Sequence, residues 1–132
     1  MKNEHPRIFV IDDDPLIASS LAGLLCLHGF RANPFRSSLK ALSRSYAEAP
    51  DLLISDSVMP ELSGVELAIR MRALCPHCDV LLFSERPSAV IAILGVESPY
   101  GPFHVMPKPE RAEELLAVIG ALRWRSLRLF WS

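Results

Sequence analysis

The sequence lacks any apolar run long enough to cross a membrane, and it contains few cysteines. Its longest apolar stretches, such as Ile8 to Ile11 and Val80 to Phe83, are far shorter than the roughly 18 residues that a spanning helix needs. Three cysteines are too few for a disulfide framework, and the polar stretch Met1 to Pro6 precedes no apolar signal segment. We therefore expect a cytoplasmic protein.

Neither sign of charge is in excess. The chain has 14 Lys and Arg against 15 Asp and Glu in 132 residues, whereas a nucleic-acid-binding domain normally carries a basic excess. A hydrophobic fraction of 50% excludes intrinsic disorder and is sufficient for one buried core. These proportions predict a single compact domain that does not bind nucleic acid.

Several familiar catalytic motifs are also missing. There is no Gly-rich dinucleotide loop, no phosphate-binding G-K-[ST] loop and no Gly-x-Ser-x-Gly elbow. Cys75-Pro76-His77-Cys78 has the spacing of a redox dithiol or half a zinc site, but it follows a predicted helix and precedes a predicted strand. We interpret it as a turn with two incidental thiols.

What the chain does contain is an alternation of short apolar runs with helical periods. Helical spacing is clearest from Ala112 to Leu122 and weakest from Ser88 to Leu94. Five alternations predict a doubly wound α/β fold, with a parallel sheet between two layers of helices. The predicted strands are Ile8 to Ile11, Phe30 to Pro34, Leu52 to Ser55, Val80 to Phe83 and His104 to Met106.

Polar residues stand where the predicted strands end, at the edge where open parallel sheets bind ligands. Three aspartates follow the first strand, and an aspartate, a serine and a lysine follow the third, fourth and fifth: Asp12, Asp13, Asp14, Asp56, Ser84 and Lys108. A purely structural role is the alternative, and Asp14 before Pro15 is typical of a helix cap. Agreement among four strand ends favours a functional site.

Three carboxylates at one edge require a cation. Two like charges about 4 Å apart repel by about 4 kcal/mol at an effective dielectric of roughly 20. Asp12, Asp13 and Asp56 would repel one another in this way if they lay at the same edge. A few carboxylate oxygens with positions left for water and phosphate favour Mg²⁺ over Ca²⁺ or Zn²⁺. An aspartate could then accept a phosphoryl group, with Lys108 and Ser84 binding its oxygens.

These segments resemble the response regulator receiver domain of two-component signalling. The most specific part is the Asp-x-x-Met-Pro-x-x-x-Gly spacing that begins at Asp56 and ends at Gly64. The resemblance implies a flavodoxin-like sheet with strand order 2-1-3-4-5, in a receiver domain over residues 1–122. The matching segments are Ile8 to Pro15, Asp51 to Pro60, Ser63 to Leu67, Leu82 to Ser84 and Pro107 to Pro109.

The resemblance also implies roles for the site residues. Asp56 would be the phosphoacceptor, and Asp13, Asp56 and the backbone carbonyl of Val58 would ligate Mg²⁺, with Asp12 acting mostly through water. Lys108 would pair with the phosphoryl oxygens.

Two further expectations come from the same resemblance. Ser84 would be the hydroxyl that moves toward the new phosphate. The Lys108-Pro109 peptide bond would be cis.

The resemblance further implies a partner and a mode of action. A histidine kinase or phosphotransfer protein would phosphorylate Asp56, and the domain would signal by protein contact, with a homodimer left open. No enzyme activity is expected beyond self-catalysed phosphorylation and dephosphorylation. No output domain follows in the sequence, which predicts a stand-alone regulator unless the chain is part of a longer one.

The chain departs from the family pattern at three places. Val105 stands where an aromatic is usual, with Phe103 two residues upstream, so an aromatic relay from Ser84 is in doubt. Glu85 replaces the usual small residue after Ser84. The segment Gly95 to Phe103 is rich in Pro and Gly. We therefore expect the fourth helix to be short or irregular.

Two rival functions and one unassigned segment remain open. A phosphohydrolase of the haloacid dehalogenase type would use Asp12 as nucleophile and Asp14 as acid. A pseudo-receiver would keep the fold and act without phosphorylation. Residues 123–132 combine three arginines with three aromatics; they could be a docking or dimerising tail, a membrane-surface helix or an extension of the last helix.

Overall fold

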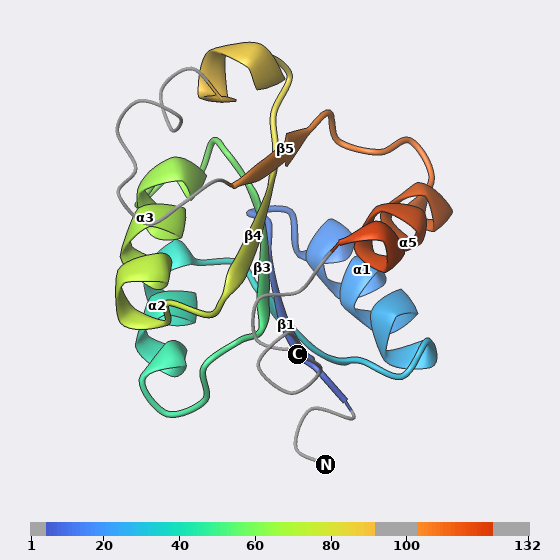
Figure 1. The fold of residues 1–132 in the computed structure, drawn as a ribbon, viewed down its shortest axis with the longest axis horizontal. Coiled ribbons are helices and arrows are strands. Elements are labelled where there is room, and N and C mark those ends of the chain that lie inside the picture. The colour runs from blue at the N-terminus through green and yellow to red at the C-terminus, as the bar shows by residue number, and fades with distance from the viewer. Residues whose placement is uncertain (1–4, 92–102, 123–132) are drawn as a thin grey trace.

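The computed structural model describes residues 5–91 and 103–122, and its centre is a five-stranded sheet (Figure 1). All strand pairs are parallel, and the order is β2-β1-β3-β4-β5. The predicted fold class and strand order are therefore confirmed. The strands are β1 (Arg7–Ile11), β2 (Arg31–Phe35), β3 (Leu52–Asp56), β4 (Asp79–Phe83) and β5 (His104–Met106).

Helices cover both faces of the sheet. Figure 1 shows α1 and α5 on one side, with α2 and α3 on the other. Residues 87–91 are also helical, which agrees with the start of the predicted fourth helix, while 92–94 lie outside the described residues. The bounds are α1 (Pro15–Leu27), α2 (Ser38–Ser45), α3 (Gly64–Leu74) and α5 (Ala112–Ala121).

Local sequence signals fix both ends of α1. The carboxylate of Asp14 accepts a hydrogen bond from the Leu16 amide at 3.0 Å, a cap that contributes about 1 kcal/mol. Gly29 ends the helix with a φ of 92°, a conformation that suits glycine. Ser37 and Ser63 cap α2 and α3 in the same way.

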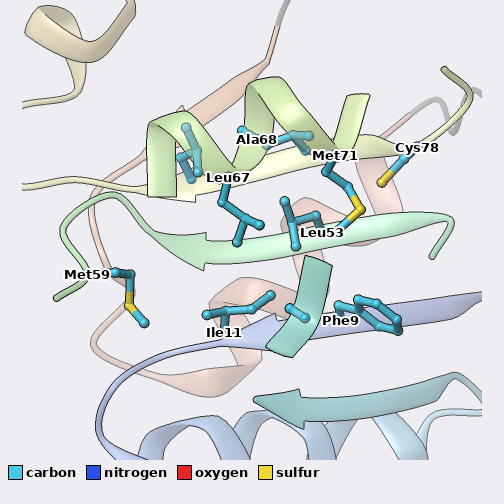
Figure 2. Packing of buried hydrophobic residues seen from close by; sticks show 11 residues of the cluster. Phe9, Ile11, Leu53, Met59, Leu67, Ala68, Met71 and Cys78 are labelled. Atoms are coloured by element: carbon cyan, nitrogen blue, oxygen red, sulfur yellow. The ribbon is translucent and has the colours of Figure 1, made fainter. Parts of the chain in front are cut away.

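The core forms two clusters, one on each face of the sheet. Figure 2 shows the cluster under α3, where Leu67 and Met71 pack over Leu53, with Ile11 and Phe9 on the neighbouring strand. The other cluster lies between the sheet and the pair α1 and α5. Alternate residues of β1, β3 and β4 enter opposite clusters, so these strands are buried on both faces, as their continuous apolar sequences predicted.

Among residues 5–91 and 103–122, no helix has both the length and the hydropathy of a membrane span.

Candidate functional site

The carboxyl ends of β1, β3 and β5 bring two aspartates and a lysine together. Ile11 pairs in register with Ser55, so the residues that follow them, Asp12 and Asp56, emerge side by side at the same edge. The ammonium nitrogen Nζ of Lys108 lies 2.8 Å from Asp12 Oδ2 and 3.3 Å from Asp56 Oδ2. Lys108 therefore bridges two carboxylates that strand pairing places next to each other.

These three side chains differ in their access to water. The side chain of Asp12 is 4% exposed, that of Asp56 is 27% exposed and that of Lys108 is 40% exposed. Partial burial lowers the pKa of Lys108, but the hydrogen bond and charge of Asp12, with the charge of Asp56, outweigh burial and raise that pKa above its ordinary value. Lys108 is thus protonated at neutral pH and offsets one of two negative charges.

Backbone amides of the strand-end loops orient both carboxylates. The amide of Asp14 donates to Asp12 Oδ1 at 2.9 Å, and the amide of Val58 donates to Asp56 Oδ1 at 3.3 Å. Each aspartate therefore has one oxygen fixed by its own loop and the other turned to Lys108.

Ser84 stands at the end of β4 and shares a cleft with Asp56. The cleft has a volume of about 590 Å³, and Glu85, Arg86 and Val65 also line it. The hydroxyl of Ser84 accepts a hydrogen bond from the Arg86 amide at 3.0 Å, just before the helical residues 87–91. Ser84 thus connects the Asp56 cleft to the start of that helix.

Gly64 is required because α3 begins directly against the backbone of Asp56. A Cβ atom at position 64 would clash with the Asp56 carbonyl oxygen and come within 2.9 Å of the Ser57 Cα. The Gly64 amide donates to the Ser57 carbonyl at 2.9 Å. This close approach explains the glycine in the motif and holds the Asp56 loop in place.

Asp13 lines a different hollow from Asp56. It is exposed and lines a second hollow of about 740 Å³, with Lys40 and Glu61. Within the described part of the chain, no group of three His, Cys, Asp or Glu side chains is placed to hold a metal ion. Lys108 thus bridges Asp12 and Asp56, whereas no hydrogen bond or ion pair within the described residues joins Asp13 to this pair.

The convergence of Asp12 and Asp56 fits Mg²⁺ in chemistry. Both carboxylates are aimed at one cation, which here is the Lys108 ammonium. Mg²⁺ is typically held by one or two carboxylates, with water and phosphate oxygens completing the octahedron. The ligand roles of Asp12, Asp13, Asp56 and the Val58 carbonyl stay predictions.

A family comparison accounts for this edge of the sheet. Residues 8–120 match the sequence model of the response regulator receiver domain. The chain belongs to this family. Receiver domains belong to two-component systems, are phosphorylated on an aspartate and generally bind Mg²⁺ at that site.

Curated relatives are similar over most of this chain. The response regulator MprA of Mycobacterium avium is 32% identical over 120 residues, which cover 91% of this chain and 52% of the relative. MprA of Mycobacterium tuberculosis matches at the same identity, with 51% of its length covered. The chain thus spans about half the length of the curated relatives it matches.

Solved structures give the same likeness. A response regulator receiver domain protein from Clostridium thermocellum superposes with a TM-score of 0.74 at 28% identity, covering 92% of this chain and 98% of the other. The response regulator TrrA of Thermotoga maritima, in complex with Mg²⁺ and BeF, gives 0.71 at 25% identity, covering 87% and 96%.

One expectation from the resemblance is wrong. The Lys108-Pro109 bond is trans, so the predicted cis bond is wrong; the trans form of an X-Pro bond is favoured by about 0.5–1 kcal/mol unless the fold imposes the other. Phe103 packs against the Arg72 guanidinium, 4.7 Å from the ring centroid, and this arginine also donates to the Cys78 carbonyl before β4 begins. Phe103 is thus in contact with Arg72, and position 105 carries no aromatic ring. Residues 95–102 of the Pro- and Gly-rich segment lie outside the described residues.

The Cys75 to Cys78 segment forms the turn between α3 and β4. The Cys78 amide donates to the Cys75 carbonyl at 2.9 Å, which closes the turn. Burial raises the pKa of the Cys75 thiol and raises that of Cys78 far more. Neither thiol is activated as a redox cysteine would be, in agreement with the interpretation as incidental thiols.

The sequence analysis did not single out Arg86. Its amide donates to Ser84 Oγ, and the residue is part of the lining of the Asp56 cleft. A serine oxygen commonly accepts from the amide two residues later in a turn, and this signal could have revealed the backbone contact. The place of Arg86 in the cleft wall depends on the tertiary packing of β4 and the helical residues 87–91.

Proposed function

We propose that this receiver domain accepts a phosphoryl group on Asp56 from a histidine kinase or phosphotransfer protein and then signals by protein contact. The observation that carries the proposal is the bridge of Lys108 Nζ to Asp12 and Asp56 at 2.8 and 3.3 Å. A protonated lysine beside a half-buried carboxylate supplies the positive charge that stabilises an added phosphoryl group.

The transfer is a displacement at phosphorus. Asp56 Oδ2 forms the new P–O bond while the P–N bond of the donor phosphohistidine breaks, and the electron pair stays on the imidazole nitrogen, which takes up a proton. Asp12, Asp13, Asp56 and the Val58 carbonyl would hold Mg²⁺. When bound, the ion supplies positive charge against the phosphoryl oxygens.

Lys108 and Ser84 then act on the product. Lys108 exchanges its contact with Asp56 Oδ2 for a contact with a phosphoryl oxygen, because the acyl phosphate uses that carboxylate oxygen. The Ser84 hydroxyl accepts from the Arg86 amide and can donate its own proton to the phosphate at the same time. Movement of Ser84 toward the phosphate would pull on the start of the helix at 87–91.

The test is intact-mass spectrometry after incubation with Mg²⁺ and phosphoramidate. We expect one phosphoryl adduct on the wild type, none without metal and none on Asp56→Asn. An adduct that persists in Asp56→Asn and maps to Asp12 would instead support the phosphohydrolase. No adduct on a folded wild type would support the pseudo-receiver.

A further inference from the structure

The outward side of α1 is an uncharged strip. Residues 15–27 contain no Asp, Glu, Lys or Arg. Leu16, Ser20, Gly23 and Leu27 follow helical spacing on the exposed side of α1, and we call them the α1 strip. Leu16 is 76% exposed and Leu27 is 84% exposed. Two large apolar side chains are thus turned to solvent on one helix of the domain.

The chain leaves α5 next to this helix. α5 and α1 contact each other on the same face of the sheet (Figure 1). The helix ends at Ala121, and Leu122 is extended, with a ψ of 143°. Leu122 packs against the same core cluster as Leu21 of α1. The described chain therefore ends beside α1, with Leu122 extended rather than helical.

The residues that follow carry both of the chain's tryptophans. Residues 123–132 read Arg-Trp-Arg-Ser-Leu-Arg-Leu-Phe-Trp-Ser and lie outside the described residues. Ten residues reach at most about 33 Å when extended, whereas the 13 residues of α1 are about 20 Å long. The segment is long enough to cover the whole α1 strip.

We propose that residues 123–132 dock on the α1 strip of their own chain. The occupant is the segment that begins next to the strip, and its aromatic residues match a surface of leucine and small side chains. Trp and Phe bury large apolar area on binding, and the two exposed leucines of the strip offer such area. The last turn of α1 has no basic residue, so an arginine of the segment also complements the carbonyl end of that helix. The inference does not depend on phosphorylation of Asp56.

Tryptophan fluorescence of the full chain reports the docking directly, because Trp124 and Trp131 are the only tryptophans. We expect emission that is blue-shifted and weakly quenched by acrylamide. Leu27→Glu should shift the emission to the red and increase quenching, since a charge on the strip opposes aromatic burial. The matched control is Leu39→Glu, at a half-exposed leucine of α2 on the other face of the sheet, which should change neither.

A thiol on the strip gives a second measurement. Gly23→Cys in a Cys26→Ser background places a probe where an added Cβ meets no atom within 4 Å. Docking should slow its alkylation about tenfold relative to the same protein carrying Trp124→Ala and Trp131→Ala, which corresponds to about 1.4 kcal/mol.

Two outcomes would overturn the proposal. The segment does not bind α1 if the tryptophan emission is that of exposed side chains and does not change in Leu27→Glu, and if the thiol introduced at position 23 is alkylated at the same rate with and without the two tryptophans. Burial that is lost on dilution would assign the occupant to a second copy of the chain.

Discussion

Lys108 sets the charge balance of the site. It faces a nearly buried Asp12 and a half-buried Asp56, and these carboxylates raise its pKa above the ordinary value of 10.5. A folded-state pKa that is raised gives stability that is fully present below the unfolded-state pKa, near 10.4, and is lost as the pH rises through the folded value.

Lys108→Met should therefore destabilise the domain by a roughly constant amount between pH 7 and 9, about 1 kcal/mol because the lysine is 40% exposed. The difference from the wild type should shrink only above about pH 10.4. Urea unfolding at several pH values measures it. A difference that already changes between pH 7 and 9 would contradict the assignment to Lys108.

Glu85 adds a negative charge to the cleft that Asp56 lines. Glu85→Ala should speed phosphorylation by a small anionic donor about twofold, because two unit charges roughly 8 Å apart in water repel by about 0.5 kcal/mol. The initial rate of adduct formation by mass spectrometry measures this, with Glu113→Ala on α5 as a control. The increase in phosphorylation rate should become smaller as salt is added, because salt screens the charge of Glu85. A rate increase that is independent of salt would indicate a steric cause.

At the scale of elements, the contact between α3 and the Asp56 loop depends on one missing Cβ. Gly64→Ala should destabilise the domain by about 2 kcal/mol or more, because the methyl group meets backbone atoms that cannot move independently. Gly23→Ala is the matched control: a Cβ there meets nothing within 4 Å, and alanine should stabilise α1 by about 0.5–1 kcal/mol. Urea denaturation compares the two variants, and equal effects would contradict the close approach.

At the scale of the whole molecule, the three free cysteines differ in how deeply they are buried. Cys26 is exposed, Cys75 is half-buried and Cys78 is buried, and burial raises the pKa of the last two thiols. Alkylation at neutral pH should modify Cys26 first and Cys75 more slowly. Cys78 should react only in parallel with global unfolding, as monitored by mass spectrometry across a urea series. Early labelling of Cys78 would mean that the α3–β4 turn opens locally.

The predictable part of the fold came from local patterns. Apolar runs located the central strands, and Asp14 with Pro15 located the start of α1 within one residue. β2 was a weak prediction because it is an edge strand with half-exposed residues, which leave little apolar signal. Trans geometry at Pro109 was missed because an X-Pro bond has two accessible forms and only packing decides between them.

By itself, the sequence determined the fold class, the order of strands and helices and the residues that end each strand, because periodicity and caps are local properties of the chain. Only the tertiary structure decided that Lys108 sits between Asp12 and Asp56 while Asp13 faces another hollow. It also decided that Phe103 packs on Arg72 and that the leucines of α1 face outward. The physical reason is that these positions depend on loop paths and on the packing of elements far apart in the chain, about which spacing along the sequence carries no information.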